Sequence, residues 1–380
     1  MSAEPRAWRR TVTLRELARR LGVNPSTVSR VLNRRPTPHV SEATRARIFE
    51  VAAAAGYRPN RLARSLKLQR THMIGMLIPD VTNPHFSALF RAVDDAASAA
   101  GYHVILCNTD DRSDRLQQHL AALGEGHVDG LIVACARRHE PALDVLRAWR
   151  LPYVLLNRRR DVADEVGVVP DDEQAARLAV AHLRALGHQR IAHVAGSSEV
   201  SRSVARLRGF RQAMAAAGVS APPCVTVSRD LDEEAGAAAF AELWALPPAQ
   251  RPTAVFAAND LVALGVLSAA RRWGLRVPDD LSIVGSDDLP VGRYATPALT
   301  TVRLPVTAMG RLATELLIRQ LEAGASAADS PRAIVVPVEL VVRESSAPLL
   351  AGESSRDRPG AAPYPEPRHG NGERGDEPSE

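Results

Sequence analysis

Apolar residues recur at helical spacing near the start of the chain. Leu17, Ala18 and Leu21 lie three, four and seven residues after Leu14. This spacing places them on one face of a helix. Gly22 then permits a tight turn, and Asn24 before Pro25 is typical of a new helix, because asparagine caps free N–H groups and proline needs no hydrogen bond at the first helical position. The pattern predicts two short helices joined by a turn.

The second predicted helix, which starts at Pro25, has an apolar face of Val28, Val31 and Leu32. Near its amino terminus, the opposite face carries Ser26, Thr27, Ser29 and Arg30. A third helix is predicted from a cap at Ser41 to Gly56, because glycine can end a helix in the left-handed conformation. This order is typical of a helix-turn-helix domain, whose second helix enters the major groove of DNA.

The polar face suggests a division of roles on DNA. Arg30 suits a bidentate contact with guanine, and Ser26 suits a base edge or a phosphate. Thr27 and Ser29 are expected to position the backbone. The alternative is that all four side chains are simply solvated.

A short basic segment follows, in which Asn60 can cap a helix of about two turns that ends near Lys67. Such a helix is marginal in water, so we expect it to order only when docked. Its Arg61, Arg64 and Lys67 indicate DNA, and Leu66 is the candidate wedge between base steps of the minor groove. A linker helix packed on the larger domain remains the alternative.

From residue 73 onward, short apolar runs alternate with helical stretches, as a parallel α/β sheet requires. Strands are predicted at 73–79, 103–108, 130–135, 153–157, 191–196, 254–259, 281–287 and 335–342, and helices include 86–100 and 172–186. Ligands of such sheets bind beyond the carboxyl ends of the strands. The polar residues at those ends are Asp80, Asn83, Asn157, Asn259, Asp260, Asp287 and Asp288. Singly, each could be only a helix cap or a turn residue; together they would form a polar site.

Charge is distributed unevenly along the 380 residues. The first 71 residues hold 16 Lys and Arg against 4 Asp and Glu, whereas the rest hold 32 against 39. The basic segment is interleaved with apolar residues, which favours a folded surface facing phosphates over a solvated tail. No run is apolar enough for a membrane helix, and the three cysteines, Cys107, Cys135 and Cys224, fit neither a disulfide framework nor a metal cluster. We expect a cytoplasmic, nucleoid-associated protein.

Residues 11–66 resemble the lactose-repressor/galactose-repressor (LacI/GalR) family of transcriptional regulators. The motifs that carry the resemblance are Thr13-Leu14-Arg15-Glu16-Leu17-Ala18, Gly22-Val23, Thr27-Val28-Ser29-Arg30-Val31-Leu32-Asn33, Val40-Ser41-Glu42, Gly56-Tyr57-Arg58-Pro59-Asn60 and Leu62-Ala63-Arg64-Ser65-Leu66. The resemblance implies base-reading positions at Pro25, Ser26 and Arg30, and an intercalating Leu66. The full expected DNA-binding set is Pro25, Ser26, Thr27, Ser29, Arg30, Asn33, Tyr57, Asn60, Ala63, Arg64, Leu66 and Lys67. The connection at 34–39 is about two residues longer than the family pattern and is expected to alter the phosphate contacts there.

The resemblance continues to about residue 345. It implies a fold similar to periplasmic sugar-binding proteins, with two parallel-sheet subdomains and an effector between them. Its marks include Pro79-Asp80-Val81-Thr82-Asn83-Pro84, Leu186-Gly187-His188, Arg206-Leu207-Arg208-Gly209-Phe210, Ala258-Asn259-Asp260 and Asp287-Asp288. The effector-binding residues that it implies are His85, Phe86, Asn157, Arg202, Arg206, Asn259 and Asp287. Asn157 stands where an aspartate is common, and Ser286 replaces a usual aromatic, so the ligand class stays open, with a sugar or sugar derivative as the default.

The expected fold is a small all-α helix-turn-helix head plus an α/β periplasmic-binding-protein-like domain of two parallel-sheet subdomains. Its expected divisions are a flexible 1–11, a head at 12–58, a hinge at 59–71, an effector-binding and dimerisation domain at 72–347, and a disordered tail at 348–380. We expect a homodimeric repressor that binds a near-palindromic operator under control of a small molecule. No cofactor, metal site, membrane contact or catalysis is expected, since the sequence holds no P-loop or zinc-protease motif. The alternatives are a solute-binding protein and an architectural DNA-binding protein without an effector.

Overall fold

The computed structural model describes residues 12–33, 36–57, 70–219, 224–227, 230–323 and 333–349. Contacts divide the chain into two compact units, Met1–Thr71 and His72–Glu380. Within the described residues, no helix is both long and apolar enough to cross a membrane.

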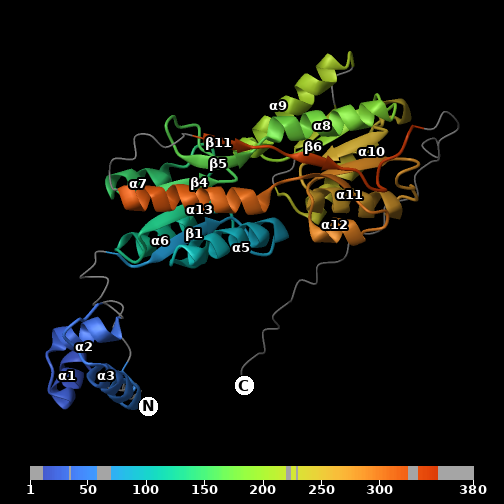
Figure 1. Ribbon diagram of the computed structural model, residues 1–380. Coiled ribbons are helices and arrows are strands. Elements are labelled where there is room, and N and C mark those ends of the chain that lie inside the picture. Colours follow the sequence, from blue (N-terminus) through green and yellow to red (C-terminus); the bar gives the residue numbers. More distant parts are fainter. Residues whose placement is uncertain are drawn as a thin grey trace, which may run out of the picture. The chain divides into compact units, whose positions relative to one another are not determined.

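The first unit contains the three predicted helices, α1 (Leu14–Leu21), α2 (Pro25–Leu32) and α3 (Glu42–Ala54) (Figure 1). Thr13 and Glu16 form a capping box at the start of α1, and Gly22 ends that helix at φ 67°. The Asn24 side chain accepts a hydrogen bond of 2.9 Å from the Ser26 N–H, so the sharp turn into α2 has the predicted cap. The core of this unit consists of Leu17, Ala18, Val28, Val31, Ile48 and Ala52.

The second unit contains two six-stranded sheets. The first has the order β11-β5-β4-β3-β1-β2, and all of its neighbouring strands are parallel. Its strands are β1 (Met73–Ile78), β2 (His103–Asn108), β3 (Gly130–Val133), β4 (Tyr153–Leu156), β5 (Gly167–Pro170) and β11 (Ala333–Val336).

The second sheet has the order β12-β10-β9-β8-β6-β7. Only β12 is antiparallel to its neighbour, β10, among the pairs of this sheet that the structure describes. Its strands are β6 (Ile191–Ala195), β7 (Cys224–Val227), β8 (Ala254–Ala257), β9 (Ser282–Asp287), β10 (Thr300–Arg303) and β12 (Glu339–Val341).

Helices cover each sheet and define two lobes (Figure 1). The first lobe contains α5 (Pro84–Ala99), α6 (Ser113–Gly124), the 3-10 turn η1 (Pro141–Leu143), α7 (Asp144–Ala148) and α13 (Val306–Ala323). The second lobe contains α8 (Asp172–Ala185), α9 (Ser201–Ala216), α10 (Glu233–Ala245), η2 (Pro248–Gln250), α11 (Asp260–Arg272) and α12 (Pro290–Tyr294). The chain crosses between the lobes after β5, after β10 and between β11 and β12.

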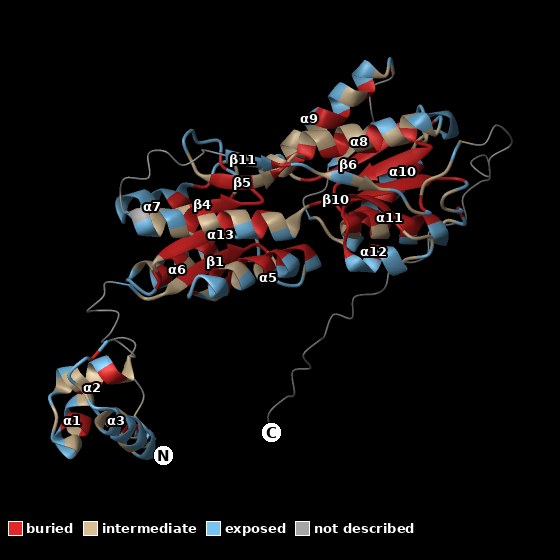
Figure 2. Ribbon diagram, in the orientation of Figure 1, coloured by how far each residue is buried: buried red, intermediate tan, exposed pale blue. Residues whose placement is uncertain are grey.

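The central strands form the buried layer of each lobe, as the red ribbons of Figure 2 show, whereas the edge strands β2, β11 and β12 are mostly half-buried or exposed. Most predicted strands and both named helices are confirmed to within two residues at either end. The single strand predicted at 335–342 is wrong. Pro337 lacks the N–H that a continuing strand needs, and the chain there passes from β11 in one sheet to β12 in the other. Three four-residue strands, β5, β7 and β10, were not predicted from the sequence pattern.

Candidate functional site

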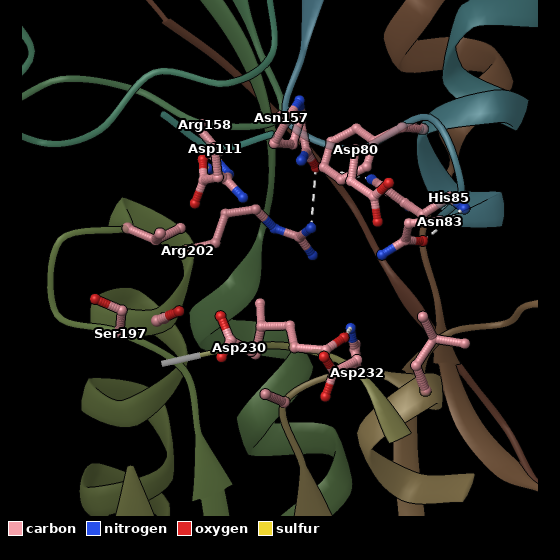
Figure 3. Close-up of a pocket in the computed structure, with 18 of the residues that line it drawn as sticks. Asp80, Asn83, His85, Asp111, Asn157, Arg158, Ser197, Arg202, Asp230 and Asp232 are labelled. Atoms are coloured by element: carbon pink, nitrogen blue, oxygen red, sulfur yellow. Dashed lines mark hydrogen bonds and ion pairs between the residues drawn. The ribbon is translucent and has the colours of Figure 1, made fainter. Parts of the chain in front are cut away.

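A cavity of about 320 Å³ lies between the two lobes. Its wall includes all seven residues expected to bind an effector: His85, Phe86, Asn157, Arg202, Arg206, Asn259 and Asp287. Figure 3 shows Asp80, Asn83 and His85 on one side and Asp230 and Asp232 on the other. Six further polar residues that the sequence pattern did not predict also line the cavity: Asp110, Asp111, Arg158, Ser197, Asp230 and Asp232.

Strand ends and helix starts position these side chains. His85 and Phe86 lie in the first turn of α5, after β1, and Asn157 follows β4. From the second lobe, Asn259 follows β8 and Asp287 is the last residue of β9. The cavity therefore lies beyond the carboxyl ends of parallel strands, where ligands of such sheets bind.

Two arginines of α9, one helical turn apart, share a buried carboxylate. Arg202 Nε lies 3.1 Å from Asp172 Oδ2, and Arg206 Nη2 pairs with Asp172 Oδ1. Burial alone would raise the pKa of Asp172, but the two guanidinium groups outweigh burial and hold that pKa below its usual value. Asp172 thus orients both arginines from outside the cavity wall. The sequence pattern did not predict this positioning role.

Asn157 connects the two lobes through its side-chain oxygen. Its Oδ1 accepts a hydrogen bond of 3.0 Å from Arg202 Nη1, drawn as a dashed line in Figure 3. The same Oδ1 lies 3.1 Å from His85 Nε2. The backbone of Asn157 has φ 67°, a left-handed conformation that asparagine adopts more readily than most residues.

His85 is 2% exposed, and burial is the main influence on the pKa of its imidazole. Burial lowers the pKa of His85 more than the nearby Asp287 carboxylate raises it. The ring is therefore neutral at physiological pH. His85 Nδ1 lies 3.9 Å from Asp287 Oδ1.

The two adjacent aspartates at the end of β9 point to different surroundings. Asp287 lines the cavity, with φ 122° and its Oδ1 3.6 Å from Arg202 Nη2. Asp288 lies outside the cavity wall and pairs with Arg293, Arg303 and Arg343. Among the polar strand-end residues, Asp260 likewise lies outside the wall, where it accepts hydrogen bonds from Thr301 and Leu289.

Asn259 is both a helix cap and a residue of the cavity wall, the two roles that the sequence left open. Its Oδ1 accepts a hydrogen bond of 2.8 Å from the Val262 N–H and so caps α11, while its Nδ2 donates to the Leu231 carbonyl at 2.8 Å. The opposite wall carries Phe86, whose ring meets His85 edge-on at 5.0 Å between centroids and has the Arg158 guanidinium 6.0 Å from its centroid. Phe86 thus adds an apolar ring to the cavity wall, beside the polar His85 and Arg158.

Four buried polar atoms of the cavity wall have no hydrogen-bond partner among the described residues. They are His85 Nδ1, Asn157 Nδ2, Arg206 Nε and Asp287 Oδ1. A buried polar atom without a partner costs about 1–3 kcal/mol. A polar ligand could supply the missing hydrogen bonds.

In the first unit, Ser26 and Arg30 are exposed on α2, and Pro25, Thr27 and Ser29 are half-buried. Asn33 Nδ2 donates to the Ser29 carbonyl at 2.6 Å, and Tyr57 packs against the head core. The remaining expected DNA-binding positions lie outside the described residues: Asn60, Ala63, Arg64, Leu66 and Lys67.

Two family models match the chain. The model of bacterial regulatory proteins of the lacI family matches residues 13–60, and that of the periplasmic binding protein-like domain matches residues 180–346. The ribose operon repressor of Escherichia coli is 36% identical over 310 residues, which cover 81% of this chain and 93% of that protein.

Solved structures show the same architecture. The lac repressor dimer bound to operator and the anti-inducer ONPF has a TM-score of 0.79 at 28% identity, with 89% of this chain and 100% of that chain covered. A LacI family regulator from Enterococcus faecium with bound ribose has a TM-score of 0.65 at 30% identity, with 73% and 100% covered. The ribose operon repressor is similar to this chain over 93% of its own length. The chain therefore belongs to the lacI family of bacterial regulatory proteins, which are DNA-binding transcriptional repressors rather than enzymes.

Proposed function

We propose that this repressor acts as a homodimer on a near-palindromic operator and that a sugar or sugar derivative in the inter-lobe cavity changes its affinity for DNA. The observation that carries the effector proposal is the set of four buried polar wall atoms without partners among the described residues. Hydroxyl groups both donate and accept hydrogen bonds, so a sugar is suited to a wall that holds both kinds of unpaired atom. The ribose bound to the Enterococcus faecium relative supports this class.

The DNA-binding part of the proposal rests on the head. Exposed Ser26 and Arg30 at α2 suit the major groove, and the excess of Lys and Arg over the first 71 residues suits phosphates. The segment 60–67 is proposed to enter the minor groove, with Leu66 as the wedge. Two heads related by a two-fold axis would read the two halves of the operator.

Contacts between the lobes suggest how the effector acts. Arg138 N–H donates to the Glu199 carbonyl at 2.8 Å, and Arg137 Nη1 lies 2.9 Å from Glu199 Oε2. A ligand that contacts both lobes would stabilise this arrangement and shift the population of lobe orientations. The ligand can change the affinity for DNA only if it binds the two lobe arrangements with unequal affinity.

Selection of bound duplexes from a random library by the purified full-length protein tests the operator proposal. We expect enrichment of a near-palindrome with a kinkable central step. Thermal denaturation with increasing D-ribose, D-xylose, D-glucose and cellobiose tests the effector proposal, because a true ligand stabilises in proportion to the logarithm of its concentration over Kd. Sequences without two-fold symmetry would contradict the dimer, and no stabilisation by any sugar would contradict the effector class.

A further inference from the structure

We propose that Asn157 and His85 set the hydrogen-bond specificity of the cavity, Asn157 as a donor and His85 as an acceptor, so that it takes a ligand without anionic groups that has two neighbouring hydroxyl groups. This inference rests on the proposed function and identifies the ligand class. It follows from which atoms of the wall can donate and which can only accept.

The orientation of the Asn157 amide is fixed by Arg202. A guanidinium group has donors and no acceptor. The amide atom that lies 3.0 Å from Arg202 Nη1 must therefore be the oxygen. This leaves Asn157 Nδ2 as a donor in a side chain that is 1% exposed, without a partner among the described residues.

The same oxygen fixes the protonation of His85. Asn157 Oδ1 can only accept, so His85 Nε2, 3.1 Å away, must carry a proton. Because burial keeps the imidazole neutral, its Nδ1 has a free lone pair. His85 Nδ1 is thus a buried acceptor that needs a donor.

The second acceptor is close to the first. Asp287 Oδ1 lies 3.9 Å from His85 Nδ1, and neither atom has a hydrogen bond from a described residue, although the Arg202 guanidinium forms an ion pair of 3.6 Å with Asp287 Oδ1. A single hydroxyl group donates one hydrogen, so it cannot satisfy both acceptors. Two hydroxyl groups on adjacent carbons can, and their oxygen lone pairs can accept from Asn157 Nδ2 and Arg206 Nε.

The charge of the wall argues against an anionic ligand. The wall carries six aspartates and three arginines: Asp80, Asp110, Asp111, Asp230, Asp232 and Asp287, with Arg158, Arg202 and Arg206. Arg202 and Arg206 are paired with Asp172 behind the wall, whereas Asp110 and Asp111 are paired with Arg115 and Arg158, so the negative charge remains in excess. A phosphorylated or carboxylated sugar would meet net negative charge at short range, which costs free energy.

Nitrogen-15 NMR of the full-length protein without ligand tests the donor and acceptor assignment. We expect His85 at pH 7 to show a protonated Nε2 and an unprotonated Nδ1, with its signals identified by their loss in His85→Gln. His193 is an internal control, because its Nδ1 lies 2.8 Å from the Phe256 carbonyl and must carry the proton instead. A protonated His85 Nδ1 would overturn the assignment.

Asn157→Asp provides the matched variant. The new carboxylate beside Nε2 should favour the imidazolium, so His85 should bind a second proton at higher pH than in the wild type. Unchanged His85 nitrogen signals across the pH range would overturn the Asn157–His85 contact. The readout needs no ligand, and near-equal melting temperatures show that the variant folds.

Matched sugars test the ligand class by thermal denaturation and calorimetry. The pairs are D-ribose with D-ribose 5-phosphate and D-glucose with D-glucose 6-phosphate. We expect each phosphate to bind at least tenfold more weakly than its parent, and Asn157→Asp to bind the preferred neutral sugar at least tenfold more weakly than the wild type. Tighter binding of a phosphate than of its parent sugar would overturn the ligand class alone. If none of the sugars binds, both the ligand class and the proposed sugar effector are overturned. If a sugar binds but His85 Nδ1 is protonated, only the hydrogen-bond assignment is overturned.

Discussion

Asp172 is a buried carboxylate that lies behind the cavity wall rather than in it. Its side chain is 3% exposed and contacts two arginines that are 12% and 5% exposed. Removing one partner of such a group leaves buried charge without compensation, which costs about 3–5 kcal/mol. Asp172 therefore stabilises the second unit as well as orienting its cavity.

Asp172→Asn should lower the free energy of unfolding of the second unit by about 3 kcal/mol at pH 7, measured by urea denaturation. Because the pKa of Asp172 is lowered in the folded protein, its stabilisation is present above the unfolded value of about 3.9 and is lost as pH falls through the folded value. The variant should therefore lose less stability than the wild type on acidification below that value.

Glu173→Gln is the matched control. Glu173 is the next residue on α8, but its ion pairs with Arg177 and Arg208 are partly solvated, so the loss should stay below about 1 kcal/mol. Equal losses for the two variants would show that Asp172 is not a buried structural charge.

Sequence alone could predict the cavity residues that follow obvious strands, but not this carboxylate. Asn157, Asn259 and Asp287 each end a predicted apolar run, and the structure brings them to one cavity. Asp172 follows β5, a four-residue strand too short to give a pattern. Its partners lie 30 and 34 residues away on α9, a pairing that only the folded chain reveals.

Helices α10 and α11 approach each other through glycines. A Cβ atom added to Gly265 would overlap the Glu233 carbonyl oxygen, and one added to Gly236 would overlap that of Val262. The missing side chains allow the two helices to pack backbone to backbone. In the sequence these glycines look like ordinary helix interruptions, because spacing within one helix says nothing about how close a second helix lies.

Gly265→Ala should destabilise the second unit by at least about 1–3 kcal/mol, since overpacking against backbone cannot relax through a side-chain rotation. Taken alone, the change would favour a helix by about 0.5–1 kcal/mol, so the sign of the result is diagnostic. Urea denaturation gives the measurement, and Ser268→Ala on the exposed side of α11 should be nearly neutral. Stabilisation by Gly265→Ala would contradict the close packing of α10 and α11.

The whole molecule separates a basic head from an acidic effector-binding unit. The first 71 residues carry 16 Lys and Arg against 4 Asp and Glu, and the remaining residues have an acidic excess. Attraction to DNA is therefore concentrated in the head and hinge, and the effector-binding unit contributes repulsion from phosphates. Operator affinity should accordingly fall steeply with salt concentration.

Arg30 and Arg64 should contribute to DNA binding in different ways. Arg30→Ala should cost about 1–3 kcal/mol on the operator and relax specificity at one position of each half-site, because a bidentate contact with guanine is lost. Arg64→Ala should weaken binding to operator and random duplexes equally and reduce the slope of log K against log salt by about 0.9 per contact. Binding titrations of both variants on both duplexes at several salt concentrations separate these outcomes, and each variant is the control for the other. If Arg30→Ala weakened the two duplexes by the same factor, its side chain would contact phosphate rather than a base, and readout by the head would have to rest on Ser26 and the deformation of the duplex.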